Sequence, residues 1–148
     1  MPHKILFITT SHDQLGDTGE KTGLHYEELS TPYYYFKDKG FEVDIASIKG
    51  GKAPIDPSSK DTDAESVARF KGDSEALGKL ENTLYIGDVQ SEDYWAVYLP
   101  GGHGTMWDLP ESNLLIKTLE AFWAEEKPLG AVCHGPAGLV NIKDNLGH

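Results

Sequence analysis

The sequence predicts one α/β domain over residues 1–148, with a mostly parallel sheet and helices on both of its faces. Short β-branched apolar runs alternate along the chain with stretches of helical spacing, which is typical of a parallel sheet. These apolar runs are strand-sized and indicate buried strands. Unusual turns follow three of the predicted strands, at the sheet edge where such folds bind ligands. We therefore expect a ligand site at that edge.

The first half of the chain begins with a predicted strand over residues 4–10, KILFITT. After a polar loop with glycines, residues 25–40 carry large side chains at helical spacing and stop at Gly40, which suits a helix C-terminus. Pro32 lies inside this stretch, so the helix either begins near it or is kinked there. Residues 41–48 form the second predicted strand.

The middle of the chain, residues 49–90, is its least regular part. It opens with turn-forming residues and continues with a broken helical pattern over residues 63–83. We predict an insertion that lies over one face of the sheet.

The second half resumes the strand–helix alternation. Residues 95–102 form the third predicted strand and end in a glycine-rich turn, and residues 111–128 form an amphipathic helix. A fourth strand over residues 129–133 turns at once into a helix. The expected apolar face of the amphipathic helix consists of Leu115, Leu119, Phe122 and Trp123.

Charge and composition narrow the classes of partner. The net charge of −11 repels phosphate backbones and anionic membranes, so neither nucleic acid nor a membrane is an expected partner. A single cysteine and the absence of a signal peptide predict a cytoplasmic location. The scattered histidines and the lack of a dinucleotide motif predict no metal and no cofactor.

The stretch GAVCHGPAG contains the only cysteine, Cys133. A strand that ends in a reactive residue and turns directly into a helix forms a nucleophile elbow, and small neighbours let the backbone turn tightly. A helix N-terminus beside the sulfur would stabilise the thiolate. The alternative is a small buried structural cysteine.

The stretch LPGGHG follows the third strand. The N–H groups of Gly101 and Gly102 can point at a developing oxyanion, although a simple tight turn explains the glycines equally well. His103 either binds substrate or is a solvated loop histidine.

Three segments together resemble the ThiJ/PfpI superfamily, whose fold is similar to that of class I glutamine amidotransferases: AVCHGPAGL, LPGGHGTMWDL and TGLHYEELSTPYYYFKDKGFEVDIAS. The resemblance is strongest to the heat-shock chaperone and glyoxalase III branch. It implies a flavodoxin-like α/β sandwich in which Cys133 is the nucleophile and His134 its neighbouring histidine. It also implies that Glu28 is the glutamate that hydrogen-bonds the sulfur. By residue type alone, Glu27 and Glu28 also fit a charged first helical turn.

One part of this pattern is missing from the sequence. In that branch an acidic residue further downstream orients the histidine after the cysteine, whereas this sequence stops at His148. Asp144 lies too close to the elbow to replace it. We therefore expect a C-terminally shortened fold with an open sheet edge, and a homodimer that could cover it.

The resemblance implies a glyoxalase of the glyoxalase III type, also described as a D-lactate dehydratase, which converts the small dicarbonyl methylglyoxal to lactate without glutathione. His25, Tyr26 and Trp107 are candidates to line its pocket. One alternative is a holdase chaperone that uses the tyrosines of residues 33–35. Others are a protein deglycase, an intracellular cysteine peptidase, a redox sensor and an inactive relative.

Overall fold

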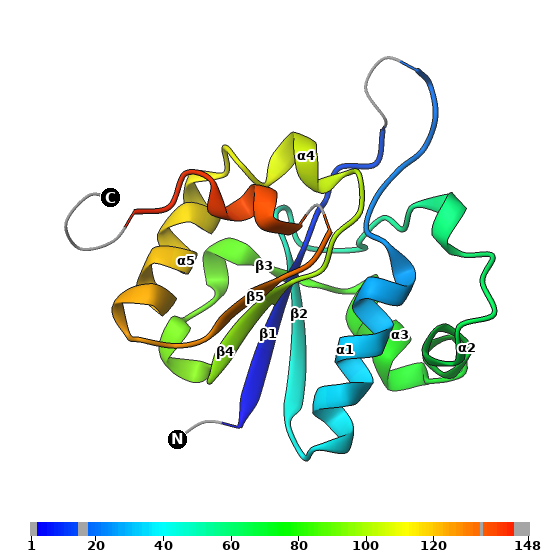
Figure 1. The fold of residues 1–148 in the computed structure, drawn as a ribbon, viewed down its shortest axis with the longest axis horizontal. Coiled ribbons are helices and arrows are strands. Elements are labelled where there is room, and N and C mark those ends of the chain that lie inside the picture. The colour runs from blue at the N-terminus through cyan, green and yellow to red at the C-terminus, as the bar shows by residue number, and fades with distance from the viewer. Residues whose placement is uncertain (1–2, 15–17, 134, 144–148) are drawn as a thin grey trace.

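The computed structural model describes residues 3–14, 18–133 and 135–143. A sheet of five parallel strands lies between two layers of helices, which Figure 1 shows nearly edge-on. The order of the strands across the sheet is β3-β2-β1-β4-β5. The strands are β1 Lys4–Thr9, β2 Glu42–Ser47, β3 Leu84–Tyr85, β4 Ala96–Leu99 and β5 Leu129–Ala131. The predicted α/β class with a parallel sheet is confirmed.

Helices cover both faces of the sheet, as predicted. In Figure 1 the helices α1, α2 and α3 lie on the right of the sheet, α5 lies on the left, and α4 lies above the strands. Their bounds are α1 Tyr26–Asp38, α2 Glu65–Lys71, α3 Ser74–Glu81, α4 Thr105–Asp108 and α5 Asn113–Ala124. Short 3-10 helices cover Pro57–Ser59, Ile86–Asp88, Ser91–Asp93 and Gly135–Leu139.

The position of strand β1 in the centre of the sheet explains why its sequence is apolar at successive positions instead of alternating. Ile5 and Phe7 point into the core under α1, whereas Leu6 and Ile8 point into the core under α5. All four side chains are fully buried. A central parallel strand covered on both faces must be apolar at every position.

The middle segment differs from the prediction in one respect. It contains β3, a fifth strand that pairs with the end of β2 through Ala46 and Ser47. Helix α3 packs against β2, and α2 packs against α1, so the segment also covers one face as expected. The strand was missed because Leu84 and Tyr85 are exposed and give no burial pattern.

Helix α1 is continuous across Pro32. It begins at Tyr26, whose N–H donates to the hydroxyl of Ser59 in the middle segment. Tertiary contacts therefore fix the first turn. Because proline has no N–H, the carbonyl of Glu28 receives no helical hydrogen bond from position 32.

Two expectations for the C-terminal half are wrong in detail. In α5, Leu115, Leu119 and Phe122 are fully buried, but Trp123 lies outside the apolar face and is 53% exposed. The element after Cys133 is a five-residue 3-10 helix instead of an α-helix. Within the described residues, no helix is both long and apolar enough to cross a membrane.

Candidate active site

The turn after β4 and the turn after β5 lie side by side at the carboxyl edge of the sheet. The two strands pair in parallel, and Leu99 lies opposite Ala131 in the register. Gly101 therefore comes close to Cys133, although the two residues are 32 positions apart in the sequence. Adjacent parallel strands place their following turns together.

Cys133 occupies a sharp turn with the left-handed backbone angle φ 52°. The Gly135 N–H closes the turn by donating to the Val132 carbonyl at 2.7 Å. The cysteine is exposed, which contradicts the alternative of a buried structural residue. Because the following 3-10 helix is short, the helix dipole contributes less to thiolate stability than expected.

Glu28 reaches this turn from the first half of α1. Its Oε1 accepts a hydrogen bond from the Gly101 N–H at 3.0 Å. A β-carbon at position 101 would lie 2.3 Å from Glu28 Oε1 and 2.9 Å from the β-carbon of Cys133, so no side chain larger than hydrogen fits there. Glu28 and Cys133 therefore both lie against the position that a β-carbon of Gly101 would occupy.

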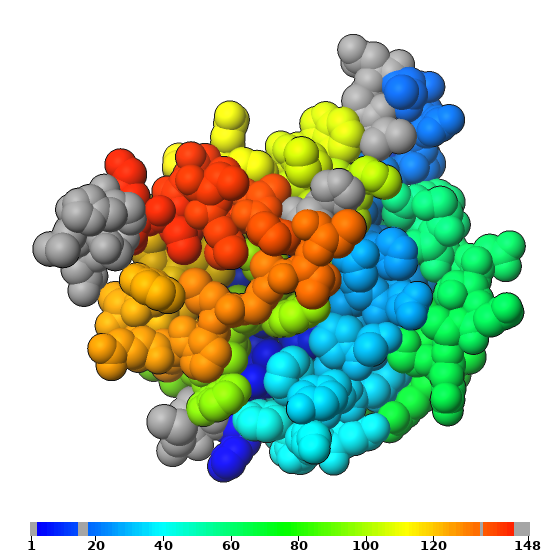
Figure 2. Space-filling view, in the orientation of Figure 1, coloured from blue at the N-terminus to red at the C-terminus, as the bar shows by residue number. Residues whose placement is uncertain are grey.

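These two residues share a cavity of about 370 Å³ that is open to solvent. Figure 2 shows the orange segment that leads to Cys133 beside the blue-to-cyan surface of α1. The lining residues are His25, Glu27, Glu28, Thr31, Pro32, Tyr98, Val132 and Cys133. His134, the third predicted catalytic residue, lies outside the described residues.

Tyr98 of β4 lines the cavity and was missed in the sequence. Burial raises the pKa of its phenol, and the nearby Glu28 carboxylate raises it further. The phenol is therefore neutral and can only act through hydrogen bonds at neutral pH. The alternation of side chains along β4 could have identified Tyr98, because Val97 and Leu99 face α5 whereas Tyr98 faces α1.

The remaining members of the glycine turn differ from one another. Gly102 has φ 128°, a left-handed conformation that favours glycine, and among the described residues its N–H donates no hydrogen bond. The Gly101 N–H is already bound to Glu28. His103 is not among the residues that line the cavity; its ring is 57% exposed and lies with Nδ1 3.5 Å from Asp56 Oδ2.

Asp56, also missed in the sequence, is a buried carboxylate in the middle segment. Burial alone would raise its pKa, but hydrogen bonds from Ser58, His103 and Thr22 outweigh this effect and lower it. The side chain is therefore charged at neutral pH. The sequence predicted only that the residues around Asp56 form turns. A single aspartate between prolines gives no indication that its side chain is buried.

Backbone hydrogen bonds join the middle segment to the site. The Leu24 N–H donates to the Pro54 carbonyl at 2.9 Å, and the Asp56 N–H donates back to the Leu24 carbonyl at 2.8 Å. The next residue, His25, donates its N–H to the Gly101 carbonyl at 2.9 Å. The segment thus fixes the chain that enters α1 against the glycine turn.

The other predicted lining residues have different places. Tyr26 is 3% exposed and packs edge-on against Phe70 in the core. Trp107 stacks on His12 with ring centroids 5.0 Å apart, and the cavity lining does not include it. Among the described residues, no group of three histidine, cysteine or acidic side chains is placed to hold a metal ion.

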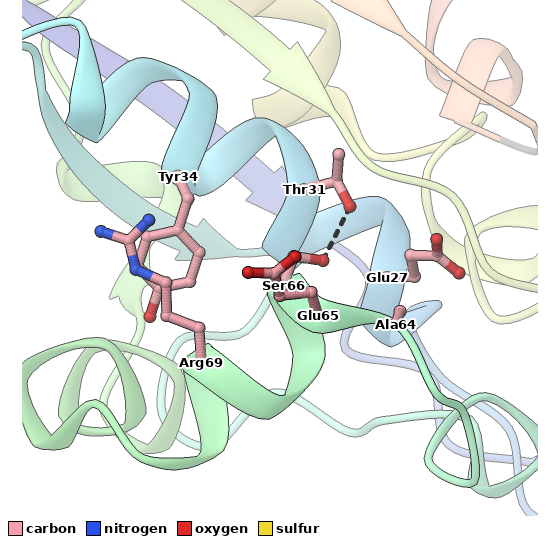
Figure 3. Close-up of a pocket in the computed structure, with 7 residues that line it drawn as sticks. All are labelled: Glu27, Thr31, Tyr34, Ala64, Glu65, Ser66 and Arg69. Atoms are coloured by element: carbon pink, nitrogen blue, oxygen red, sulfur yellow. Dashed lines mark hydrogen bonds between the residues drawn. The ribbon is translucent and has the colours of Figure 1, made fainter.

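A second groove of about 350 Å³ adjoins the first, since Glu27 and Thr31 line both. Figure 3 shows it between α1 and α2, with the Thr31 and Ser66 hydroxyls hydrogen-bonded across it at 2.8 Å. Glu27 and Glu65 both belong to its lining. At the other end of the groove, the guanidinium of Arg69 lies over the ring of Tyr34, 3.8 Å from its centroid.

Comparison with known proteins places this site among named relatives. Glutathione-independent glyoxalase hsp3102 of Schizosaccharomyces pombe is 34% identical over 143 residues, which cover 95% of this chain and 60% of the relative. Protein/nucleic acid deglycase HchA of Pseudomonas aeruginosa is 32% identical over 123 residues, which cover 80% and 42%. The crystal structure of Rapid Encystment Protein 24 KDa of Francisella tularensis has a TM-score of 0.93 and 41% identity, and the match covers 99% of this chain and 65% of that one.

The chain thus spans less than two thirds of the length of each of these three proteins. Residues 21–146 match the DJ-1/PfpI family, and this range includes the glutamate, the glycine turn and the cysteine elbow. The match confirms the resemblance carried by the three sequence segments. The chain belongs to the DJ-1/PfpI family.

Proposed function

We propose that the protein is a glyoxalase that converts methylglyoxal to lactate without glutathione. The observation that carries the proposal is that Cys133 and Glu28 both lie against Gly101 and line one open cavity. This arrangement brings a nucleophile and an acid–base group to the same small substrate. The similarity to a protein named glutathione-independent glyoxalase supports it.

In the proposed reaction, the Cys133 thiolate adds to the aldehyde carbon C1, and the carbonyl oxygen becomes an alkoxide of a hemithioacetal. The Gly102 N–H is the proposed donor to this alkoxide, since Glu28 already occupies the Gly101 N–H. Glu28 then removes the proton from C1, which gives an enediolate; a proton is returned to C2, and solvent supplies a second proton to the C2 oxygen. The product is a lactate thioester of Cys133, which water hydrolyses to lactate and the thiolate, with the release of two protons to solvent.

The test is lactate formation from methylglyoxal by the purified chain in the absence of glutathione. We expect none from Cys133→Ala and a loss of about 100-fold or more from Glu28→Gln, the usual size of an acid–base contribution. Glu42→Gln is the matched control, because Glu42 is exposed at the start of β2, away from the site. Lactate formed by Cys133→Ala at the parent rate would contradict the proposal.

A second candidate function is removal of dicarbonyl adducts from basic side chains of proteins. The observation that favours it is the second groove, which extends the cavity and carries the carboxylates of Glu27 and Glu65. Such a lining suits an arginine or lysine peptide and repels nucleic acid. A relative named protein/nucleic acid deglycase supports the same class of reaction.

The two functions are separated by Glu65→Gln, because Glu65 lines the second groove and not the cavity around Cys133. If the groove holds basic peptides, the variant turns over an arginine-peptide adduct of methylglyoxal more slowly and keeps the parent rate with free methylglyoxal. Equal loss on both substrates, or none on either, argues against the deglycase function. Glu42→Gln again serves as the control.

No observation favours the holdase chaperone. Tyr33 and Tyr34 are 0% and 5% exposed because they pack in the core with Phe70, and Tyr35 alone of the three tyrosines is exposed. The aromatic cluster in α1 therefore stabilises the fold instead of presenting a surface for unfolded chains.

A further inference from the structure

His25 lies at the junction between α1 and the glycine turn. It is the N-cap residue of α1, but its side chain makes no capping hydrogen bond. Its backbone N–H donates to the Gly101 carbonyl at 2.9 Å, which holds the residue beside Glu28 and Cys133. The imidazole lines the cavity that contains both. Something other than helix capping therefore has to account for the side chain.

The Nδ1 atom of His25 is buried and has no hydrogen-bond partner among the described residues. The carboxylate oxygen Glu28 Oε2 lies 3.8 Å away. The side chain as a whole is 40% exposed, so another part of the same ring reaches the solvent of the cavity. Burying a nitrogen without a hydrogen-bond partner costs free energy of folding. An unpaired nitrogen beside a candidate catalytic residue therefore indicates a functional role.

The carboxylate of Glu28 is divided between two neighbours. Oε1 is held by the Gly101 N–H, so Oε2 is the oxygen that remains for a proton. His25 Nδ1 lies 3.8 Å from Oε2, and a shift of about 1 Å would bring the pair to hydrogen-bond distance. Hydrogen bonds between catalytic groups are often this long before substrate binds.

We infer that His25 carries protons between Glu28 Oε2 and solvent during the proposed glyoxalase reaction, on which this role rests. Neutral imidazole accepts a proton on one nitrogen and releases one from the other, so a proton taken from C1 by Glu28 leaves through the ring. A solvent proton returns by the same route to Glu28 and then to C2. No electrons are transferred, and the ring is unchanged after each cycle.

The other titratable groups of the cavity do not offer this route. Tyr98 is a neutral phenol because burial and the Glu28 charge raise its pKa. Glu27 lines the cavity with an exposed side chain, and Cys133 is bonded to the substrate during the proton transfer. His25 alone among the described lining residues combines a buried nitrogen at Glu28 with an exposed ring.

The test follows the origin of the hydrogen at C2 of lactate. Ordinary methylglyoxal is converted in D2O, and deuterium at C2 is read by NMR from the collapse of the methyl doublet. We expect most of the parent's lactate to carry deuterium at C2. We expect His25→Asn to form lactate that retains mostly the substrate's own hydrogen. Asparagine is a good N-cap and keeps a polar group near Glu28, so the variant is expected to fold.

Two further arms complete the experiment. His3→Asn is the matched control, because His3 lies before β1 at the opposite end of that strand, and it should leave the label unchanged. His25→Ala with added imidazole should regain deuterated lactate, because the open cavity admits a small base. A purely structural role for His25 would not respond to imidazole.

Each outcome decides the inference. Equal deuterium in the parent and in His25→Asn, or no deuterium in the parent, overturns the role of His25 and leaves the glyoxalase proposal intact. If His25→Asn forms no lactate, recovery of deuterated lactate in the imidazole arm supports the role, and no recovery overturns it. No lactate from the parent overturns the proposed function and this role with it.

Discussion

The two sides of the site are held by very different parts of the molecule. Glu28 stands on a helix of 13 residues whose inner face is buried, with Tyr26, Leu29 and Tyr33 at most 3% exposed. Cys133 follows β5, a strand of three half-buried residues that, in the described part of the chain, lies at the edge of the sheet and pairs only with β4. The acid side, which carries Glu28, is therefore held by the buried core. The nucleophile side, which carries Cys133, is held by a strand at the margin of the sheet.

The hydrogen bonds show the same contrast. On the acid side, the middle segment supports α1 through Ser59 and the charged Asp56 network. On the nucleophile side, the described backbone bonds around the elbow are Val132 N–H to the Leu99 carbonyl and Gly135 N–H to the Val132 carbonyl. Packing thus positions the acid, whereas the backbone of a few residues positions the sulfur. Gly101 is the point where the two sides meet.

The largest expected effect comes from a change at that meeting point. Gly101→Ala would place a β-carbon 2.3 Å from Glu28 Oε1 and 2.9 Å from the Cys133 β-carbon, and would push the two apart. A displacement of about 1 Å costs on the order of 100-fold in rate, so we expect at least that loss of lactate formation. Gly78→Ala in α3 is the control, since its β-carbon meets nothing within 4 Å. Activity within twofold of the parent would show that the two sides are not coupled through Gly101.

The next effect compares one substitution on the two sides. Leu29→Ala empties a fully buried position in α1 and should lower the free energy of unfolding by about 2–5 kcal/mol. Leu129→Ala removes a half-buried side chain from β5 and should cost about 1 kcal/mol. Urea unfolding followed by circular dichroism measures both. Equal losses would contradict the division into a core side and a marginal side.

The smallest expected effect concerns the carboxylate that supports the acid side. Asp56→Asn places an amide where Thr22 and His103 now bond to oxygen, and should lower the free energy of unfolding by about 1–3 kcal/mol at neutral pH. Because the folded protein lowers the pKa of Asp56, its contribution is present above the ordinary aspartate pKa of about 3.9 and is lost as pH falls through the lower folded value.

This pH dependence provides the measurement. The difference in unfolding free energy between the parent and Asp56→Asn should shrink when urea titrations at neutral pH are repeated below the ordinary aspartate pKa. Asp61→Asn, at an exposed position nearby, should show no such difference at either pH. A difference that stays constant with pH would mean that the charge of Asp56 does not stabilise the fold.

The strands and helices with strong apolar patterns were predictable from the sequence. Residues 4–10 and 111–128 correspond to β1 and α5, because buried runs and an amphipathic stripe report directly on the two cores. The two-residue strand β3 and the exposure of Trp123 were not predictable, since sheet edges and helix margins depend on tertiary neighbours. The type of each strand or helix could be predicted from its hydrophobic pattern. The boundaries of these elements depend on tertiary packing, which the local pattern does not contain.

The candidate site was predictable only in part. The cysteine, the glycine turn and Glu28 were predicted from the sequence; in the structure Glu28 and Cys133 line one cavity, and Gly101 lies against both. Asp56 was missed, and the sequence left His103 either as a substrate-binding residue or as a solvated loop histidine, without its contact to Asp56. Both depend on a contact between residues 47 positions apart, and no local pattern encodes such a contact.

The left-handed backbone of Cys133 has a consequence for how the protein balances folding against chemistry. A residue with a β-carbon costs on the order of 1–2 kcal/mol in this region, and glycine avoids that cost. Cys133→Gly should therefore be inactive yet at least as stable as the parent. A sequence chosen for stability alone would carry glycine at position 133, so the cysteine marks the point where reactivity opposes the preference of the fold.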